Sequence, residues 1–165
     1  MRIIILFMLL LFTGALAGTP AITEVRNLYK ASAVQEDSCR KLIDILKAYN
    51  ETNNPLLTGY RACATMMMAS YVINPFTKLS KFNDGKSVLE KCIGVSKENI
   101  ELRYLRFSMQ CTAPSFLGYS SSLNADKSFL LQAVSGVTDL QLKKMILSFF
   151  KTSDCLNDSE KQIIK

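Results

Sequence analysis

Residues 81–107 read KFNDGKSVLEKCIGVSKENIELRYLRF, and this stretch decides the predicted fold. Its apolar residues recur at intervals of three and four, which is typical of amphipathic helices packed on a core. One helix is expected to run to about Val95, with Gly85 at a close helix–helix contact; the alternative is a turn at Asp84-Gly85. The next helix, Glu98 to Cys111, is apolar on two faces, so we expect neighbours on both sides.

Helical spacing recurs through the rest of the chain, and no segment alternates apolar and polar residues for long. A break near Val34–Asp37 is expected to divide the first helical region into two helices. Asn54-Pro55 and Asn74-Pro75 each predict a helix start, with asparagine as the cap and proline at the first position. The expected inward residues of the helix that begins at Pro75 are Phe76, Leu79, Phe82, Leu89, Cys92 and Ile93.

The sequence pattern of the C-terminal third of the chain predicts a loop, two helices and a short terminal turn. The loop spans 112–122 and the helix after it spans about Asn124 to Ser135. Thr138 and Gln141 then form a capping box that begins the last strong helix. About seven helices joined by short turns predict an all-α fold, arranged either as a repeat of helix hairpins or as a closed bundle.

A resemblance favours the repeat. Phe82–Cys92 and Val95–Leu105 resemble the second helix of a tetratricopeptide repeat, its linker and the first helix of the next repeat. Lys97 stands where that family usually has proline, and the likeness covers roughly 34 residues, one repeat length. It implies a TPR-like array of antiparallel helix hairpins.

A second resemblance spans most of the chain after residue 17. It is to small exported helical proteins of Bacteroidota and implies no activity. The segments that carry it are Asn74-Pro75-Phe76, Arg103 to Gln110, Pro114 to Tyr119, and Asp126-Lys127.

The N-terminus has the pattern of a secretory signal peptide. Arg2 precedes an unbroken apolar run, Ile3 to Phe12, and Ala15-Leu16-Ala17 matches a cleavage site before Gly18. The run is too short to span a bilayer, which needs roughly 20 apolar residues. We therefore expect residues 1–17 to be the signal peptide and residues 18–165 to form the helical repeat-like domain. The protein would be periplasmic or secreted, without a stable membrane span after cleavage.

Composition restricts the chemistry available to the chain. The 165 residues carry a formal net charge of +6, but the basic residues are scattered, so we expect no nucleic-acid partner. There is no histidine, which excludes Ser-His-Asp and Cys-His catalysis and HExxH zinc sites. Of the five cysteines, Cys39 and Cys63 are the first candidates for a disulfide, and the alternative is that the cysteines are small buried side chains.

The loop Pro114 to Tyr119 is the best candidate binding surface. It places Phe116 and Tyr119 shortly after Arg103 and Arg106, a combination suited to a peptide, a sugar or an anionic group. The alternative is that the loop plugs the end of the helical stack. Met66-Met67-Met68 is interpreted as core packing, because three consecutive helical residues point about 100° apart.

These features predict an exported protein-interaction module that binds a protein or peptide of the cell envelope. A small-molecule or lipid-binding helical domain is the alternative, and a carboxylate-dependent enzyme is a weaker one. No residues are assigned to catalysis, a cofactor or a metal.

Overall fold

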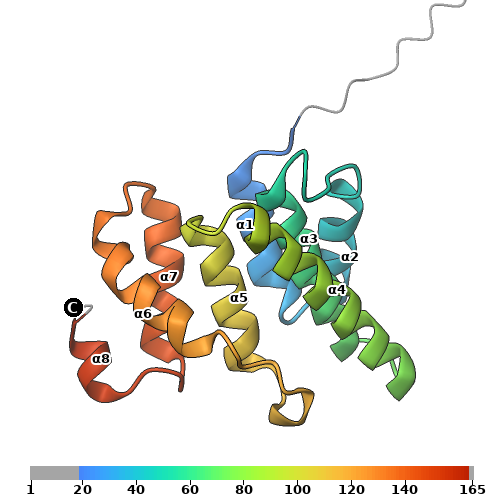
Figure 1. Ribbon diagram of the computed structural model, residues 1–165. Helices are drawn as coiled ribbons and strands as arrows, with labels where there is room; N and C mark the ends of the chain where they lie inside the picture. The colour runs from blue at the N-terminus through green and yellow to red at the C-terminus, as the bar shows by residue number, and fades with distance from the viewer. Residues whose placement is uncertain (1–18, 164–165) are drawn as a thin grey trace, which may run out of the picture.

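The computed structural model describes residues 19–163 and is all-helical over that range, which confirms the predicted fold class (Figure 1). The described part contains eight α-helices, one more than the approximate count expected. They are α1 (Ile22–Ser32), α2 (Glu36–Ile45), α3 (Pro55–Met67), α4 (Pro75–Val95), α5 (Ile100–Thr112), α6 (Leu123–Ala133), α7 (Leu140–Thr152) and α8 (Asp158–Ile163). Single 3-10 turns occur at η1 (Met68–Ser70), η2 (Ser115–Leu117) and η3 (Val134–Gly136). The predicted signal peptide, residues 1–17, lies outside the described residues.

The predicted helix starts at Asn-Pro pairs are confirmed. The side chain of Asn54 accepts a hydrogen bond from the Leu57 backbone N–H at 3.1 Å, and Pro55 begins α3. Asn74 accepts in the same way from Phe76 and Thr77, and Pro75 begins α4. Each asparagine pairs an N–H that has no partner within the helix, and each proline occupies a position where its missing N–H is not needed.

The predicted capping box at Thr138 and Gln141 is wrong by one position. Asp139 is the N-cap of α7, and its Oδ1 accepts from the Leu142 backbone N–H at 3.0 Å. The other oxygen of Asp139 accepts a hydrogen bond from Arg26 of α1, so one carboxylate both caps α7 and contacts α1.

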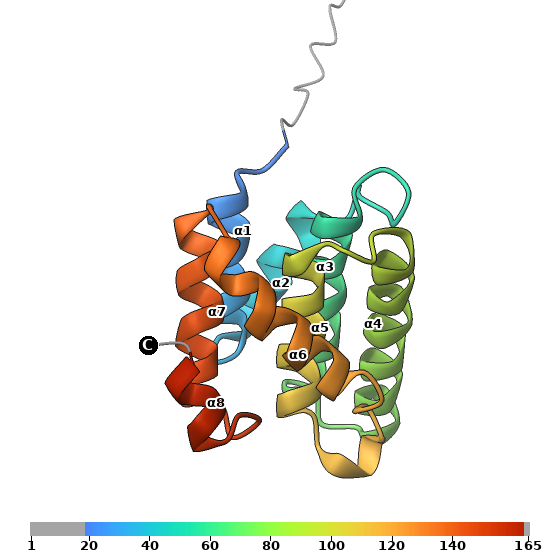
Figure 2. The same ribbon diagram turned by 60° about the vertical axis from the view of Figure 1, so that its left-hand side comes forward.

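Consecutive helices from α1 to α6 pack against one another, and α5 lies between the α1–α4 part and the α6–α7 part (Figures 1 and 2). The pairs α1/α2, α3/α4 and α5/α6 are in contact, and α3 also packs on α1 and α5. In Figure 2, α1 and α7 stand side by side although they are far apart in sequence. We call α1, α3, α5 and α7 the inner helices.

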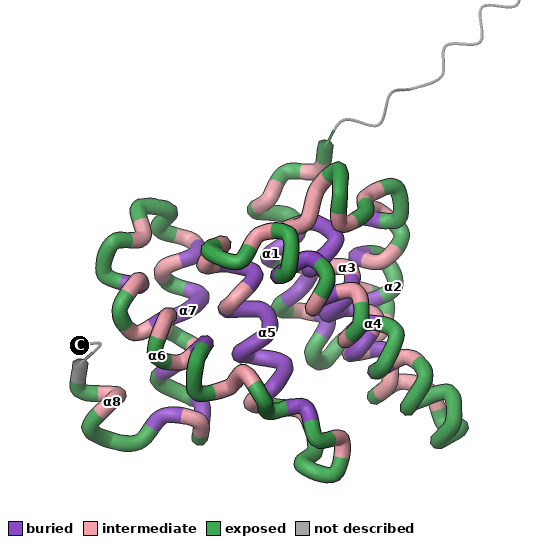
Figure 3. The backbone as a smooth tube through the Cα atoms, viewed as in Figure 1, coloured by how far each residue is buried: buried purple, intermediate pink, exposed green. Residues whose placement is uncertain are grey.

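Burial is concentrated in α5, the predicted helix with two packed faces (Figure 3). Every residue from Glu101 to Gln110 is buried except Arg103. Aromatic rings connect this helix to α7, where Phe107 makes edge contacts with both Phe149 and Phe150 at centroid distances of 5.9 and 5.8 Å. The prediction for this helix is therefore confirmed.

The prediction that Phe76 and Leu79 of α4 point inward is wrong. Phe76 is 83% exposed and Leu79 is 48% exposed, whereas Phe82, Leu89, Cys92 and Ile93 are buried as expected. The reason is that the first turns of α4 extend past the helices on which the rest of α4 packs (Figure 1).

The cysteine pairing also differs from the prediction. The disulfide joins Cys111 of α5 to Cys155, between α7 and α8, with a Cα–Cα distance of 6.0 Å. Cys39 and Cys63 are free and buried, as is Cys92. The Sγ of Cys39 donates to the Ala64 carbonyl at 3.0 Å, and burial raises the pKa of this thiol to about 11. The similar distances of Cys39 and Cys63 from the turn between their helices therefore did not predict which cysteines pair.

Gly85 marks a close contact between α4 and α3, as predicted. A Cβ at Gly85 would lie 2.4 Å from the carbonyl oxygen of Ala62 and 2.6 Å from Cγ of Met66. The backbone oxygen cannot move without disturbing α3, so the position admits only glycine at this helix separation.

We predict that Gly85→Ala lowers the free energy of unfolding by about 2 kcal/mol, because the added methyl forces α4 away from α3. Urea unfolding followed by circular dichroism measures the change. Gly94→Ala, in the same helix, is the matched control: a Cβ there meets nothing within 4 Å, and stability should stay equal or rise slightly. Equal effects of the two substitutions would refute the packing explanation.

Candidate functional site

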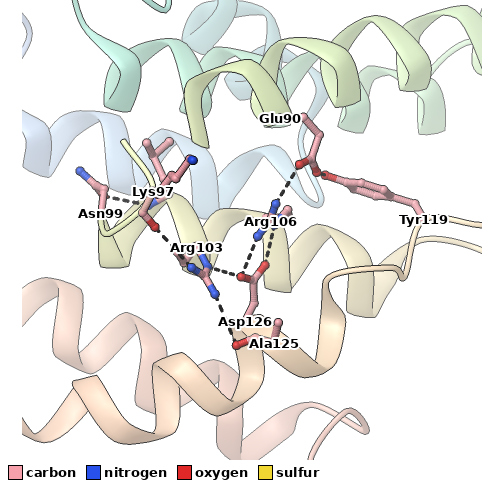
Figure 4. A network of polar contacts seen from close by, with 9 residues as sticks. Glu90, Lys97, Asn99, Arg103, Arg106, Tyr119, Ala125 and Asp126 are labelled. Carbon is pink, nitrogen blue, oxygen red and sulfur yellow. Dashed lines mark hydrogen bonds and ion pairs between the residues drawn. The ribbon is translucent and has the colours of Figure 1, made fainter. Parts of the chain in front are cut away.

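Three of the four predicted site residues meet in one polar network, which we call the Asp126 cluster (Figure 4). Arg106 of α5 bonds Asp126 of α6 through Nε at 2.6 Å and Nη2 at 2.9 Å, and bonds Glu90 of α4 through Nη1 at 2.8 Å. Arg103, one turn earlier on the same face of α5, also bonds Asp126. The Tyr119 hydroxyl donates to Glu90 at 2.7 Å.

The loop before α6 folds so that Tyr119 reaches this cluster. Gly118 has a φ of 59°, a left-handed conformation that glycine adopts without steric cost, and it turns the chain after η2 back toward α4. Tyr119 is consequently buried and packs edge-on against Phe82 with a centroid distance of 5.8 Å. Burial, followed by the hydrogen bond to Glu90, holds the pKa of Tyr119 well above its usual value.

The Asp126 cluster satisfies its own charges. Asp126 is fully buried and paired with two guanidinium groups, and Glu90 is paired with Arg106 and Tyr119. The cluster therefore holds α4, α5 and α6 together. Phe116, the fourth predicted residue, stands apart from it and is 85% exposed.

We predict that Asp126→Asn lowers the free energy of unfolding by about 3 kcal/mol, because Arg103 and Arg106 lose their shared buried counter-charge. Asp44→Asn is the control, since it removes the carboxylate of an exposed pair with Lys47 and should leave stability unchanged within error. Chemical denaturation at neutral pH measures both. A small effect of Asp126→Asn would show that the cluster contributes little to the fold.

A second polar network, the Arg26 cluster, joins the N-terminal halves of the inner helices. Arg26 of α1 bonds Glu101 of α5 at 2.7 and 2.8 Å and Asp139, the N-cap of α7, at 2.8 Å. Tyr60 of α3 donates to the same Glu101 carboxylate, and Arg26 also bonds Gln141 at 3.1 Å. The hydrogen bonds to Glu101 raise the pKa of Arg26 further, so this buried residue stays charged.

Acid should weaken the Arg26 cluster through Asp139. The pKa of Asp139 lies below its usual value because the carboxylate accepts the Leu142 N–H and, secondly, the Arg26 guanidinium. A lowered folded-state pKa contributes stability that is present above the unfolded pKa, about 4, and is lost as pH falls through the folded pKa. We predict that Asp139→Asn destabilises the protein at pH 7 and that the difference from wild type shrinks as pH falls below about 4.

The Asp139 variants separate the two roles of this residue. Asparagine retains a capping oxygen and loses the charge, whereas alanine loses both and should cost about 1 kcal/mol more at every pH. Urea unfolding at several pH values measures the differences. A stability difference between wild type and Asp139→Asn that is constant from neutral to acidic pH would contradict the ion-pair assignment.

A groove of about 1210 Å³ runs along the inner helices, and we call it the inner groove. All four inner helices line it, together with η1, the first turns of α4 and η2. Arg26 and Gln141 bound one end. At the other end lie Pro75 and Leu79 of α4 and Phe116 and Leu117 of η2.

The walls of the inner groove are mainly apolar and contain four methionines. Methionine is unbranched and polarisable, so a surface rich in it adapts to different apolar partners. Leu79 and Phe116, at the end away from Arg26, form an exposed apolar lip. The lining residues of methionine, aromatic and leucine type are Tyr29, Met66, Met67, Leu79, Phe82, Tyr104, Met109, Phe116, Leu117, Met145 and Phe149.

Sequence reasoning missed the inner groove although it found one residue of its lip. Phe116 was a predicted site residue, whereas Arg103, Arg106 and Tyr119 are not among the residues that line the groove. The interpretation of Met66-Met67-Met68 as core packing is confirmed, since Met66 and Met68 are buried in the core and Met67 packs against it; Met66 and Met67 also line the groove. An apolar stripe on a helix has the same pattern whether it faces a core or a groove, so the sequence offered no signal that distinguishes them.

No protein-family model, curated protein or solved structure matches this chain. Within residues 19–163 no helix combines the length and apolarity that crossing a membrane requires. The same residues contain no group of three or more acidic or cysteine side chains suited to hold a metal ion.

Proposed function

We propose that this protein is an exported protein-interaction module whose inner groove binds an apolar segment of a partner protein in the cell envelope. The observation that carries the proposal is the groove itself, about 1210 Å³ in volume, which extends over four helices and ends in an exposed apolar lip. Exposed apolar side chains at the edge of an apolar groove are typical of interaction sites on proteins.

The helix arrangement supports the TPR-like interpretation. Alternate helices, α1, α3, α5 and α7, line one continuous groove together with the first turns of α4, and the consecutive helices α1/α2, α3/α4 and α5/α6 are in contact, as helix hairpins would be. Stacked hairpins of this type generate extended concave binding surfaces.

Size and lining favour a peptide over the alternatives. Small-molecule pockets usually measure about 300–1,000 Å³ and enclose most of the ligand, whereas the inner groove is larger and its lip is exposed. Among the described residues, no carboxylate lines it, so the groove gives no support to a carboxylate-dependent enzyme.

The Cys111–Cys155 disulfide supports the proposed export. Disulfides persist in oxidising compartments such as the periplasm and the extracellular space. An oxidising compartment agrees with the signal-peptide pattern of residues 1–17, from which we propose a periplasmic or secreted location.

The protein contains no tryptophan, so a tryptophan-bearing peptide reports binding without background. We predict that an amphipathic model peptide with a leucine face and one tryptophan shows a saturable blue shift of its emission on addition of the protein. Phe116→Ala, which removes a lip side chain, should weaken binding about fivefold.

Leu140→Ala is the matched control, because Leu140 is 80% exposed and does not line the groove, and its affinity should equal that of wild type. Absence of a shift up to about 1 mM peptide would refute the proposal. Retention of a lipid in native mass spectrometry, together with no peptide binding, would favour the lipid-binding alternative.

A further inference from the structure

We propose that the segment held by the inner groove is an amphipathic α-helix with acidic residues beside its apolar stripe. This inference rests on the proposed function and adds the conformation and charge of the partner. Two independent observations carry it: the charges around the groove and the hydrogen-bonding state of its walls.

The charged side chains that line the inner groove are all cationic. Lys30 of α1, Lys78 of α4 and Lys144 of α7 are exposed and come from three different elements, and Arg26 is buried. Among the described residues, none of these lysines takes part in an ion pair, whereas Arg26 is fully engaged with Glu101 and Asp139. No aspartate or glutamate of the described part lines the groove.

Charge complementarity therefore favours an acidic partner. Lysines on α1, α4 and α7 surround an apolar floor, so matching carboxylates would sit on either side of the apolar stripe of the bound segment. A basic segment would meet like charges from three directions.

The hydrogen bonds of the groove favour a helix over an extended strand. Its walls are helices, whose main-chain groups already bond within each helix, so the groove has no strand edge to which a segment could add. Polar side chains in its walls are also paired: the buried hydroxyls of Tyr29 and Ser108 bond each other at 2.8 Å, and the exposed Thr112 donates to the Ser108 carbonyl at 2.9 Å. An extended segment would leave its peptide groups unpaired on this surface, whereas a helix pairs its own.

The length of the inner helices sets the scale of the bound segment. Each of α3, α5 and α7 has 13 residues, about 20 Å at 1.5 Å per residue. A partner helix lying along them would be buried over roughly three to four turns, and methionines on three walls would adjust to its side chains.

The test compares three peptides of about 16 residues that share one leucine–tryptophan face and differ only on the polar face. Their polar residues are glutamate, glutamine or lysine. A fourth peptide carries the glutamate face with a central proline, which prevents a continuous helix. Tryptophan fluorescence gives the affinity of the native, disulfide-bonded protein for each peptide.

We expect the glutamate peptide to bind about tenfold more tightly than the lysine peptide at low salt, with the difference narrowing as salt is raised. The proline peptide should bind at least about tenfold more weakly than its parent. In the variant Lys78→Glu/Lys144→Glu the charge preference should vanish or reverse. The matched control Lys91→Glu/Lys97→Glu changes net charge equally at exposed sites outside the groove and should keep the preference.

The outcomes separate this inference from the proposed function. Equal binding of the glutamate and lysine peptides, or loss of preference in both double variants, would overturn the acidic partner and leave peptide binding intact. Equal binding of the proline peptide would overturn the helical conformation. Failure of every peptide to bind would overturn both, as would binding only to vesicles of acidic phospholipid.

Discussion

Arg26 is the residue on which the arrangement of the inner helices depends. A buried guanidinium is tolerated only when it is paired and hydrogen-bonded, and Arg26 finds its partners 75 and 113 residues away, on α5 and at the start of α7. Tyr60 adds α3 through the shared carboxylate of Glu101. Four helices that are separated in sequence are thereby held at one end by a single ionic centre.

This centre also determines where a groove can exist. Because the Arg26 cluster brings the inner helices together at their N-terminal halves, their C-terminal halves enclose the space lined by Met67, Met109 and Thr152. The Asp126 cluster acts on another face of α5, where it joins α4 and α6. One helix thus carries two sets of buried charges, and its remaining face is free to form the groove floor.

Local sequence patterns predicted much of the helical structure, but they did not predict which distant side chains pair with one another. Asn54 and Asn74 mark helix starts because capping depends on a few neighbouring residues, and Gly85 marks a contact because a helix interior otherwise disfavours glycine. Glu101 and Asp126 carried no comparable mark, since a buried carboxylate and a solvated one look alike in a single sequence. The Cys111–Cys155 disulfide and the placement of Tyr119 beside Glu90 likewise depend on how distant segments meet.

The residues whose burial was predicted wrongly are informative about function. Phe76 and Leu79 follow the apolar spacing of α4 yet remain exposed, and Leu79 lines the lip of the groove together with the exposed Phe116. Exposed apolar side chains at this end gain little from folding, because the hydrophobic contribution scales with the area removed from water. A partner that covered Leu79 and Phe116 would recover that contribution. At the Arg26 end of the groove the polar side chains are hydrogen-bonded to one another, whereas at the other end apolar side chains are exposed. A bound segment would therefore bury its most apolar residues next to η2.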